Sequence, residues 1–385
     1  MKILKFAIEG LPNFKNSFDI DFVAQQRVDD DDKERLYNIF SSIYLNQTIS
    51  FIGINASGKT TILKVFSFVV GLLNNKSLNN IKAKDIFDDL GNEENAVVTA
   101  YFYHEKIIYK LQSIIVKRIN EVDGNEKLII VDETLWAKEA SKVKTKKSIY
   151  DFKNSDVNTI RNQNEQYLLE DVSIMVALNK KENANFLLYD TSLFTNYNML
   201  NVMGNFPKEI LTFLDSSIEY LHGKTEGKKE DIRLKFYGKD EIILDDSLKL
   251  DKYLSSGTIK GLSVFIGAIF AFTQGGYLVV DELENHFNKE IVTTLIRFFM
   301  DKKINKYGAT LIFSTHYSEL LDQFERNDGI YIVRNTGGIT AENLSNILRR
   351  NDIKKSEVYD SDFLQGTVPS YESYIALKKV LMSFK

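Results

Sequence analysis

The residues best suited to chemistry lie in one short glycine-containing segment. It reads Gly53-Ile54-Asn55-Ala56-Ser57-Gly58-Lys59-Thr60 and is followed by Thr61. Glycines let backbone N–H groups converge on phosphate oxygens at the start of a helix, where the helix dipole favours an anion. A lysine and a threonine directly after the second glycine supply an ammonium for the β- and γ-phosphates and a hydroxyl ligand for Mg²⁺. The segment therefore predicts a cradle, residues 53–61, that binds ATP together with Mg²⁺.

Two apolar strands further along the chain end in polar residues that suit the same chemistry. Residues 277–280 run into Asp281-Glu282, and residues 309–314 run into Thr315-His316. In P-loop proteins an acid at such a strand end holds Mg²⁺, which is the role expected for Asp281. Glu282 is then placed to orient or deprotonate the attacking water, and His316 to hydrogen-bond the γ-phosphate. Taken alone each would be read as a solvated strand end or a structural histidine, but together they predict a hydrolytic site.

A third segment, Leu254-Ser255-Ser256-Gly257-Thr258, precedes an apolar helix. Here the sequence resembles the ABC-ATPase family, whose LSGGQ-like signature occupies this place. Ser256 stands where the signature has its first glycine, and Thr258 where it has glutamine. The resemblance implies that two chains sandwich two ATP molecules, so that Ser255, Ser256 and Gly257 of one chain contact the γ-phosphate held by the other. Gln112 is the candidate for the family's Q-loop glutamine.

The branch of the family is indicated by the residues around the cradle and the acidic pair. The opening Phe51-Ile-Gly-Ile-Asn-Ala-Ser-Gly-Lys-Thr-Thr61 and the stretch Asp281-Glu-Leu-Glu-Asn-His286-Phe-Asn288 resemble the RecF- and OLD-like group. Asn288 and Lys289 replace that group's histidine and proline. The closing Phe363-Leu-Gln-Gly-Thr-Val-Pro369 resembles stand-alone bacterial ATPases of the abortive-infection type, including the ATPase subunit of PARIS-like systems.

The resemblance implies an ATPase that acts as a nucleotide-dependent sensor or scaffold in anti-phage defence. Its implied partners are a second copy of itself or a higher oligomer, a phage protein as trigger, and a separate nuclease or toxin as effector. Asp360-Ser-Asp362 is a D-x-D motif, but no preceding strand carries a catalytic glutamate, so no nuclease is expected in this chain. The alternatives are a RecF/SMC-like DNA-repair ATPase regulated by DNA, a transporter ATPase, and an ATP-locked scaffold with negligible turnover.

The fold expected from the pattern is α/β. From residue 254 onward helices alternate with apolar strands, as in a parallel sheet with crossover helices. Residues 2–9, 17–23 and 96–135 alternate in the manner of antiparallel strands. We therefore expect an ABC-ATPase head with an antiparallel β subdomain and a mainly helical insertion. The expected divisions are an N-terminal lobe over 1–136, the insertion over 137–235, and a C-terminal lobe with the tail over 236–385.

Composition limits the partners, the metal sites and the cellular location that can be expected for this chain. The 385 residues carry a net charge of -4 and no cysteine, which disfavours bulk nucleic-acid binding and excludes disulfides and thiolate metal sites. Lysines cluster at 138–147 and 224–229, and such runs are more often solvated surfaces than DNA contacts. Residues 261–280 lack charge, but Gly275-Gly276 interrupts them, so a buried helix, a turn and a buried strand are expected rather than a membrane span. A cytoplasmic location is expected.

Overall fold

The protein is described by a computed structural model over residues 1–119, 124–162, 168–192, 200, 202, 204–226, 229–285, 287–368 and 371–384. Its centre is a six-stranded sheet in the order β10-β15-β16-β5-β17-β18. The first five strands are parallel, and β18 is antiparallel to β17. The strand bounds are β5 Thr48–Ile52, β10 Leu188–Asp190, β15 Tyr277–Val280, β16 Thr310–Thr315, β17 Ile330–Asn335 and β18 Ile339–Asn343. The parallel sheet expected from the strand–helix alternation is therefore confirmed.

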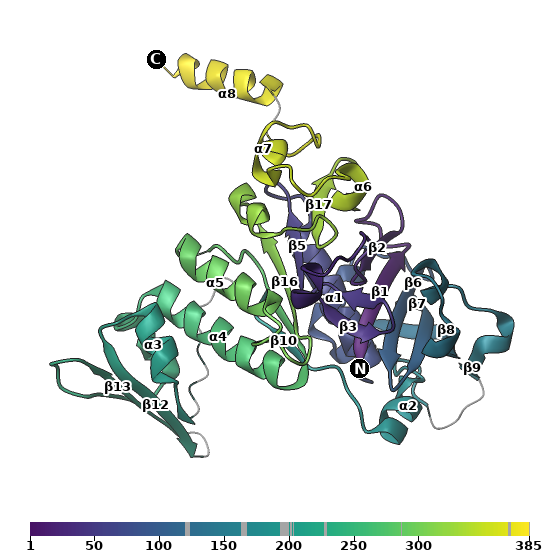
Figure 1. The fold of residues 1–385 in the computed structure, drawn as a ribbon, viewed down its shortest axis with the longest axis horizontal. Coiled ribbons are helices and arrows are strands. Elements are labelled where there is room, and N and C mark those ends of the chain that lie inside the picture. The colour runs from purple at the N-terminus through teal and green to yellow at the C-terminus, as the bar shows by residue number, and fades with distance from the viewer. Residues whose placement is uncertain are drawn as a thin grey trace.

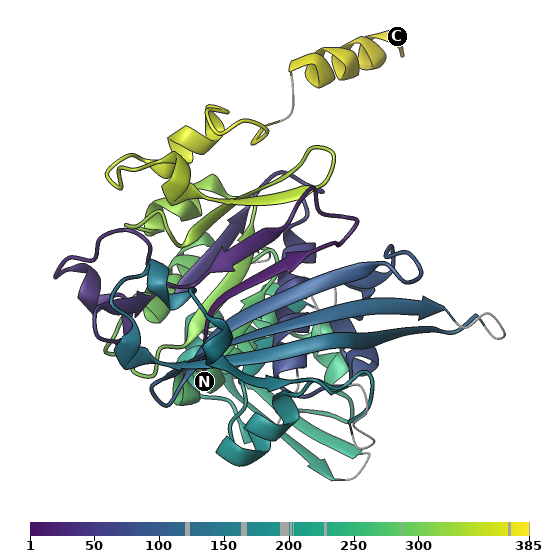
Figure 2. The ribbon, with the colours of Figure 1, turned by 90° about the vertical axis from the view of Figure 1, so that its right-hand side faces the viewer.

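A second six-stranded sheet is antiparallel throughout and has the order β2-β1-β6-β7-β8-β9. Figure 2 shows its strands, purple to blue, in front of the green elements of the parallel sheet. The predicted hairpin of residues 2–9 and 17–23 forms its β1–β2 pair. The bounds are β1 Lys2–Glu9, β2 Phe18–Asp21, β6 Asn95–His104, β7 Ile107–Ile119, β8 Glu126–Glu139 and β9 Val157–Ile160.

Helix α1, Lys59–Leu73, joins these two sheets through one core (Figure 1). The ring of Phe66 lies 5.8 Å from that of Phe6 on β1 and 5.4 Å from that of Tyr277 on β15. Twelve of its residues are buried, because both faces of the helix are covered. Burial of this extent fixes the first turn of α1, which follows the glycine-containing segment, against the parallel sheet.

A third, four-stranded sheet of order β11-β12-β13-β14 packs with helix α3 into a separate small core, seen at the lower left of Figure 1. The bounds are β11 Gly204–Asn205, α3 Lys208–Leu214, β12 Ile218–Glu226, β13 Lys229–Phe236 and β14 Ile242–Leu244. Helix α4, Ser256–Gln274, contributes Ile259 and Leu262 to this small core and Val264 and Ala268 to the core of the parallel sheet. The helix thus joins the two units.

Within the described residues, α4 is the one helix long and apolar enough to cross a membrane. However, 50% of its most apolar 18-residue stretch is buried inside the protein. It is followed by Gly275 at φ 67° and then by β15. A Cβ at Gly267 would lie 2.4 Å from the ring of Tyr189, so the helix packs closely on its neighbours. The predicted succession of buried helix, turn and buried strand is confirmed, and α4 is a core helix.

The expectation of a mainly helical segment over 137–235 is wrong. The described part of that range holds two short α-helices, α2 Met175–Glu182 and α3, together with β9, β10, β11, β12 and most of β13. The range is rich in lysine, asparagine and glutamate, and helices were expected from this polar composition. The strands form because one face of each is buried, as at Leu221 and Ile232, and this burial outweighs local propensity.

The remaining elements lie outside these three sheets. Helix α5, Lys289–Met300, crosses between β15 and β16, and a 3-10 helix, Ser318–Gln323, follows β16. Strands β3, Tyr37–Phe40, and β4, Ile43–Leu45, form a separate hairpin. The tail contains α6, Leu344–Ile347, α7, Lys355–Asp360, and α8, Tyr371–Ser383, which projects from the body (Figures 1 and 2).

Candidate nucleotide-binding site

The glycine-containing segment forms the turn from β5 into α1. Ala56 has φ 59° and Gly58 has φ 100°, so the chain passes through two left-handed positions before the helix begins at Lys59. Gly53 is required by close approach, because a Cβ there would lie 2.3 Å from the carbonyl oxygen of Val333 and 2.5 Å from Ser57 Oγ. The turn therefore brings backbone N–H groups to the amino end of a long buried helix, which suits an anion.

Lys59 is almost fully buried at the base of this turn. Its Nζ donates hydrogen bonds to the carbonyl oxygens of Gly53 at 2.9 Å and Ile54 at 3.1 Å. Burial lowers the pKa of Lys59, and the nearby carboxylates of Asp281, Glu284 and Glu282 oppose that shift. An ammonium held among acidic groups beside an anion cradle suits a phosphate that arrives with a divalent cation.

Thr60 and Asp281 meet across the parallel sheet. Thr60 Oγ1 donates to Asp281 Oδ2 at 2.8 Å, and Ser314 Oγ on β16 donates to Asp281 Oδ1. Ser314 Oγ also accepts from the backbone N–H of Glu282 at 2.7 Å. A hydroxyl and a carboxylate are the hard oxygen ligands that Mg²⁺ prefers, so these two side chains fit the cation that the sequence predicts.

Glu282 and His316 lie beside the lysine, at the ends of adjacent strands. His316 Nε2 is 3.5 Å from Glu282 Oε1, while its Nδ1 lies 3.2 Å from Lys59 Nζ and 3.1 Å from the carbonyl oxygen of Gly53. Glu282 has φ 49°, a left-handed conformation that non-glycine residues adopt rarely. The predicted strand-end residues thus converge on the turn from β5 to α1.

The other residues predicted in the cradle line its turn. Asn55 and Ala56 are exposed at its tip, Ser57 is buried, and Thr61 lies in the first turn of α1. The carbonyl oxygen of Ala56 accepts from Asn335 Nδ2 at 3.3 Å, which ties the tip to the end of β17.

The segment that resembles an ABC signature caps helix α4. Ser255 is the N-cap residue, and its Oγ accepts from the backbone N–H of Thr258 at 3.1 Å. Ser256 and Gly257 form the first turn. Because α4 runs back against β15 through a tight turn, this N-terminus lies toward the sheet edge where β15 ends at Val280. Burial lowers the pKa of Lys260 in the next turn of α4, and the charge of Glu282 opposes the shift.

Two buried residues at the site were not predicted from the sequence. Ser314 bridges Asp281 and the backbone of Glu282, and Glu284 accepts the backbone N–H of His316 at 2.6 Å. The sequence offered one signal for their role, namely that each lies close in the chain to predicted site residues. Gln112, the Q-loop candidate, lies on β7, and its described hydrogen bond is to Thr99 at 3.4 Å. His286 lies outside the described residues.

The lysine cluster at 138–147 is partly structural. Lys138 Nζ donates to the carbonyl oxygens of Ser148 and Asp151, and Lys146 Nζ donates to those of Ala24, Gln25 and Gln26. These two ammonium groups fasten the segment after β8 to its surroundings, so they contribute little to an electrostatic surface for nucleic acid.

The D-x-D motif also has structural partners. Asp362 accepts from the backbone N–H of Thr367 at 3.0 Å, and Asp360 accepts from Ser318 Oγ at 3.1 Å. Asp362 thus organises the turn after α7, and Asp360 ties the end of α7 to the 3-10 helix that begins at Ser318.

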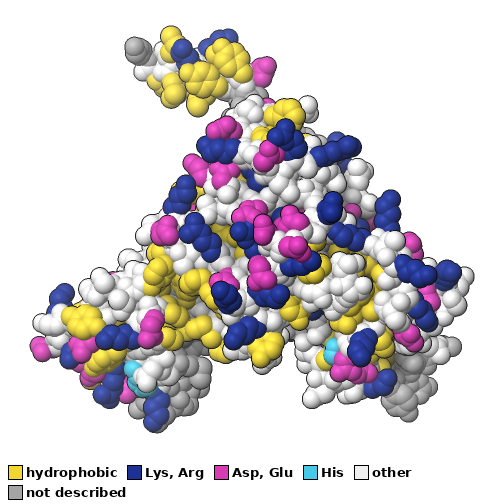
Figure 3. All heavy atoms as spheres, in the orientation of Figure 1, with side chains coloured by type: hydrophobic (Ala, Val, Ile, Leu, Met, Phe, Trp, Pro, Cys, Tyr) yellow, Lys and Arg dark blue, Asp and Glu magenta, His cyan; other side chains and the backbone are white. Residues whose placement is uncertain are grey.

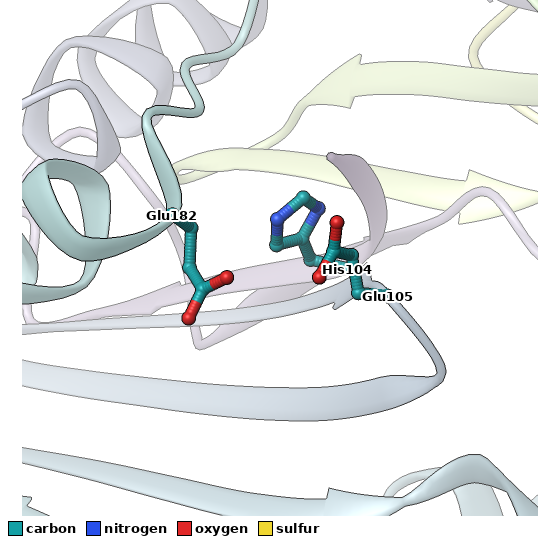
Figure 4. A group of neighbouring side chains, drawn as sticks. All are labelled: His104, Glu105 and Glu182. Carbon is teal, nitrogen blue, oxygen red and sulfur yellow. The ribbon is translucent and has the colours of Figure 1, made fainter.

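His104, Glu105 and Glu182 form a separate group, with one ligand atom from each within 4.8 Å of the others (Figure 4). They come from the β6–β7 turn and the end of α2, which are too far apart in sequence to show ligand spacing. Lys2, which neighbours this end of β6, bonds the carbonyl oxygens of Gly275 and Gly308 just before β15 and β16. The group therefore lies toward the edge of the parallel sheet opposite to the turn from β5 to α1 and takes no part in that site.

The fold and the site together define a P-loop protein: a mostly parallel sheet, a glycine-containing turn into a buried helix, and an acidic strand end beside the lysine. The chain matches the family model described as "AAA domain, putative AbiEii toxin, Type IV TA system" over residues 49–322. This range is more than half of the 385 residues, so the chain belongs to that family. It runs from β5 to the 3-10 helix after His316 and includes all the converging residues. No curated protein matches the chain.

Proposed function

We propose that this protein binds ATP with Mg²⁺ and hydrolyses it to ADP and phosphate. The observation that carries the proposal is the convergence of Lys59, Thr60 and Asp281 at one sheet edge. In this proposal the backbone of residues 53–61 and the Lys59 ammonium hold the phosphates, while Thr60 and Asp281 hold Mg²⁺. Held by Thr60 and Asp281, the cation would supply positive charge to offset the negative charge of the phosphates.

Glu282 is the proposed catalytic base, which orients the attacking water and accepts its proton. Its Oε2 accepts a hydrogen bond from Asn285 Nδ2 at 3.3 Å, while its other oxygen faces the imidazole of His316. His316 is proposed to donate a hydrogen bond to the γ-phosphate, since its ring already lies beside the lysine assigned to that group.

The site is proposed to be completed by a second copy of the chain. Ser255, Ser256 and Gly257 form a helix N-terminus, which favours an anion, and its serine-rich sequence resembles the ABC signature. Two chains related by a two-fold axis would each offer this helix end to the ATP held by the other. This ABC-type arrangement refines the family assignment.

At the level of the cell, we place the protein in bacterial anti-phage defence, in the cytoplasm. The family description names a toxin and a type IV toxin–antitoxin system, which supports a role in abortive infection together with a partner protein. The ATPase would sense infection through a phage protein and hold or release a separate nuclease or toxin, as in PARIS-like systems. The second candidate is a RecF/SMC-like ATPase regulated by DNA. It is favoured by those lysines of 138–147 that, unlike Lys138 and Lys146, have no structural role.

The test uses tagged Glu282→Gln expressed in the native host with its neighbouring genes. This change removes the base but leaves the cradle, so turnover should fall by about 10²- to 10⁴-fold while ATP stays bound. Proteins retained in Mg-ATP are identified by mass spectrometry, with Lys59→Ala as the matched variant that cannot hold ATP. A nuclease or toxin retained only by Glu282→Gln supports the defence role. Nucleic acid or repair proteins in its place would favour the second candidate, and unchanged turnover in both variants would refute the roles assigned to Glu282 and Lys59.

A further inference from the structure

Glu284 is a buried carboxylate to which the hydrolysis proposed above gives no role. Its side chain is 8% exposed. Oε1 accepts the backbone N–H of His316 at 2.6 Å, whereas Oε2 is buried and has no hydrogen-bond partner among the described residues. A buried charged group with an unsatisfied oxygen opposes folding, so packing alone does not account for a glutamate at this position.

The contact with His316 connects the ends of two neighbouring strands. Glu284 belongs to the loop after β15, and His316 follows β16 directly. The same loop is already fixed to β16 by the bond from the backbone N–H of Leu283 to the carbonyl oxygen of Ser314 at 3.0 Å. The backbone beside Glu284 is therefore fixed. The Glu284 side chain adds a second attachment of this loop, to His316, which follows β16 directly.

The backbone N–H held by Glu284 determines where the imidazole of His316 can lie. The ring sits between the carbonyl oxygen of Gly53 at 3.1 Å and Glu282 Oε1 at 3.5 Å. Both neighbours are within reach only while the backbone of His316 keeps its present position beside the turn from β5 to α1. The hydrogen bond from Glu284 is charge-assisted, which makes it stronger than a bond between neutral groups.

We propose that Glu284 is a positioning residue that acts through His316, holding the imidazole between the phosphate cradle and the base Glu282. The proposal rests on the proposed ATP hydrolysis, and it adds that the loop after β15 controls the histidine after β16. Glu284 itself does not contact the nucleotide in this proposal.

The first test is a comparison of ATPase kinetics in the full-length protein. Glu284→Ala should lower kcat about tenfold or more, as expected for the loss of a hydrogen bond to a charged group, with KM for ATP little changed because the cradle is intact. Glu284→Gln keeps an oxygen acceptor for the backbone N–H of His316 but loses the charge, so it should recover part of the loss. Glu319→Ala, an exposed carboxylate close to His316 in the chain, is the matched control. A kcat for Glu284→Ala equal to that of the parent would overturn the proposal.

A double-mutant cycle separates positioning from a general structural role. If Glu284 acts through His316, removing its side chain in a His316→Ala background should change kcat less than about twofold. An equal loss in both backgrounds, together with a lower unfolding temperature, would show that Glu284 only stabilises the fold.

A readout without turnover keeps this inference distinct from the ATPase proposal. The chain has four histidines, so NMR of histidine-labelled protein can follow the His316 ring after assignment with His316→Ala. Glu284→Ala should shift the His316 resonances, and Glu319→Ala should leave them in place. Absence of ATPase activity in the parent would refute the proposed hydrolysis, while unmoved His316 resonances would refute the positioning role.

Discussion

The Thr60 hydroxyl donates a 2.8 Å hydrogen bond to Asp281 Oδ2 and so connects the first turn of α1 to the end of β15. Both oxygens suit Mg²⁺, and Asp281 is held from its other side by Ser314 Oγ. The pair depends on two different strands, since α1 follows β5 and β15 lies beyond β16 in the sheet. The geometry of the proposed cation site is therefore set by the register of the parallel sheet rather than by one local loop.

The first prediction concerns this hydroxyl. Thr60→Val keeps the shape of the side chain and removes the oxygen, so the gain in ATP affinity that Mg²⁺ provides should fall by about tenfold or more. Thr60→Ser restores the oxygen and should retain that gain. Isothermal titration with ATP, with and without Mg²⁺, measures the difference for each variant. An equal Mg²⁺ effect in the valine variant and the parent would contradict the assignment of Thr60 as a ligand.

The second prediction concerns sharing of the site between two chains. Lys59→Ala disables the cradle, and Ser256→Arg places a bulky side chain at the N-terminus of α4, so each variant alone should be inactive. In a mixed dimer one of the two sites has both its cradle and its signature intact. An equal mixture should therefore recover about a quarter of the parent's ATPase activity if chains exchange freely and the sites are independent. Mixing each inactive variant with itself is the control, and no recovery after verified exchange of subunits would argue against a shared site.

Sequence reasoning predicted the cradle and its partners because each is marked locally. The glycines at 53 and 58, the lysine and threonine that follow, and the acids after an apolar strand are all readable from type and spacing. The parallel sheet was predictable for the same reason, since its strands are short, apolar and separated by helices. Convergence of Lys59, Asp281 and His316 then follows from the rule that parallel strands end at one edge.

The remainder depends on contacts that no local pattern records. Glu284 bonds a backbone N–H that lies 32 positions along the chain, and its spacing from Asp281 carries no signal of this. The strands between residues 204 and 236 form because they pair with one another over a small apolar core, despite a polar composition that suggested helices. Lys138 resembled part of a basic surface, but it is buried against carbonyl oxygens of a neighbouring loop. In each case the outcome was decided by tertiary packing, which composition does not record.

The third prediction concerns stability against pH and rests on Asp21. Burial raises the pKa of this carboxyl to about 7, although Tyr150 donates a hydrogen bond to it at 2.7 Å. Between the ordinary carboxyl pKa of 3.8 and this value the folded chain binds a proton that the unfolded chain does not. Asp21 therefore adds stability that is complete below about pH 4 and is lost as pH rises through about 7.

Asp21→Asn mimics the protonated carboxyl at every pH. It should therefore remove the contribution of Asp21 to the change of unfolding free energy with pH. Urea unfolding midpoints at about pH 5.5 and about pH 8 give the measurement, and the parent should lose more stability over that interval than the variant. Asp19→Asn on the same strand, whose carboxylate is 51% exposed and paired with Lys5, is the matched control and should follow the parent. Parallel curves for the parent and Asp21→Asn would show that the carboxyl of Asp21 is ionised throughout.

The last prediction concerns the tail, where α7 and α8 differ in how they are held. Tyr359 of α7 and Leu364 after it belong to the core of the parallel sheet, whereas α8 buries none of its described residues. Figure 3 shows its hydrophobic side chains at the surface, with Leu381 63% and Met382 64% exposed. Removing α8 by ending the chain after Val368 should therefore shift the unfolding temperature by no more than about 2 °C, as for surface changes in general.

Ending the chain after Arg350 instead removes α7 as well, which exposes the core beneath Tyr359 and breaks the hydrogen bonds of Ser356 with Asp322. This truncation should lower the unfolding temperature by roughly 10 °C or more, because a large buried aromatic side chain alone stabilises by several kcal/mol. Differential scanning calorimetry of the two truncations and the full chain gives the comparison. A large loss on removing α8 alone would mean that its apolar residues are covered in solution by another surface of the protein, and equal midpoints for all three chains would mean that α7 does not hold the sheet.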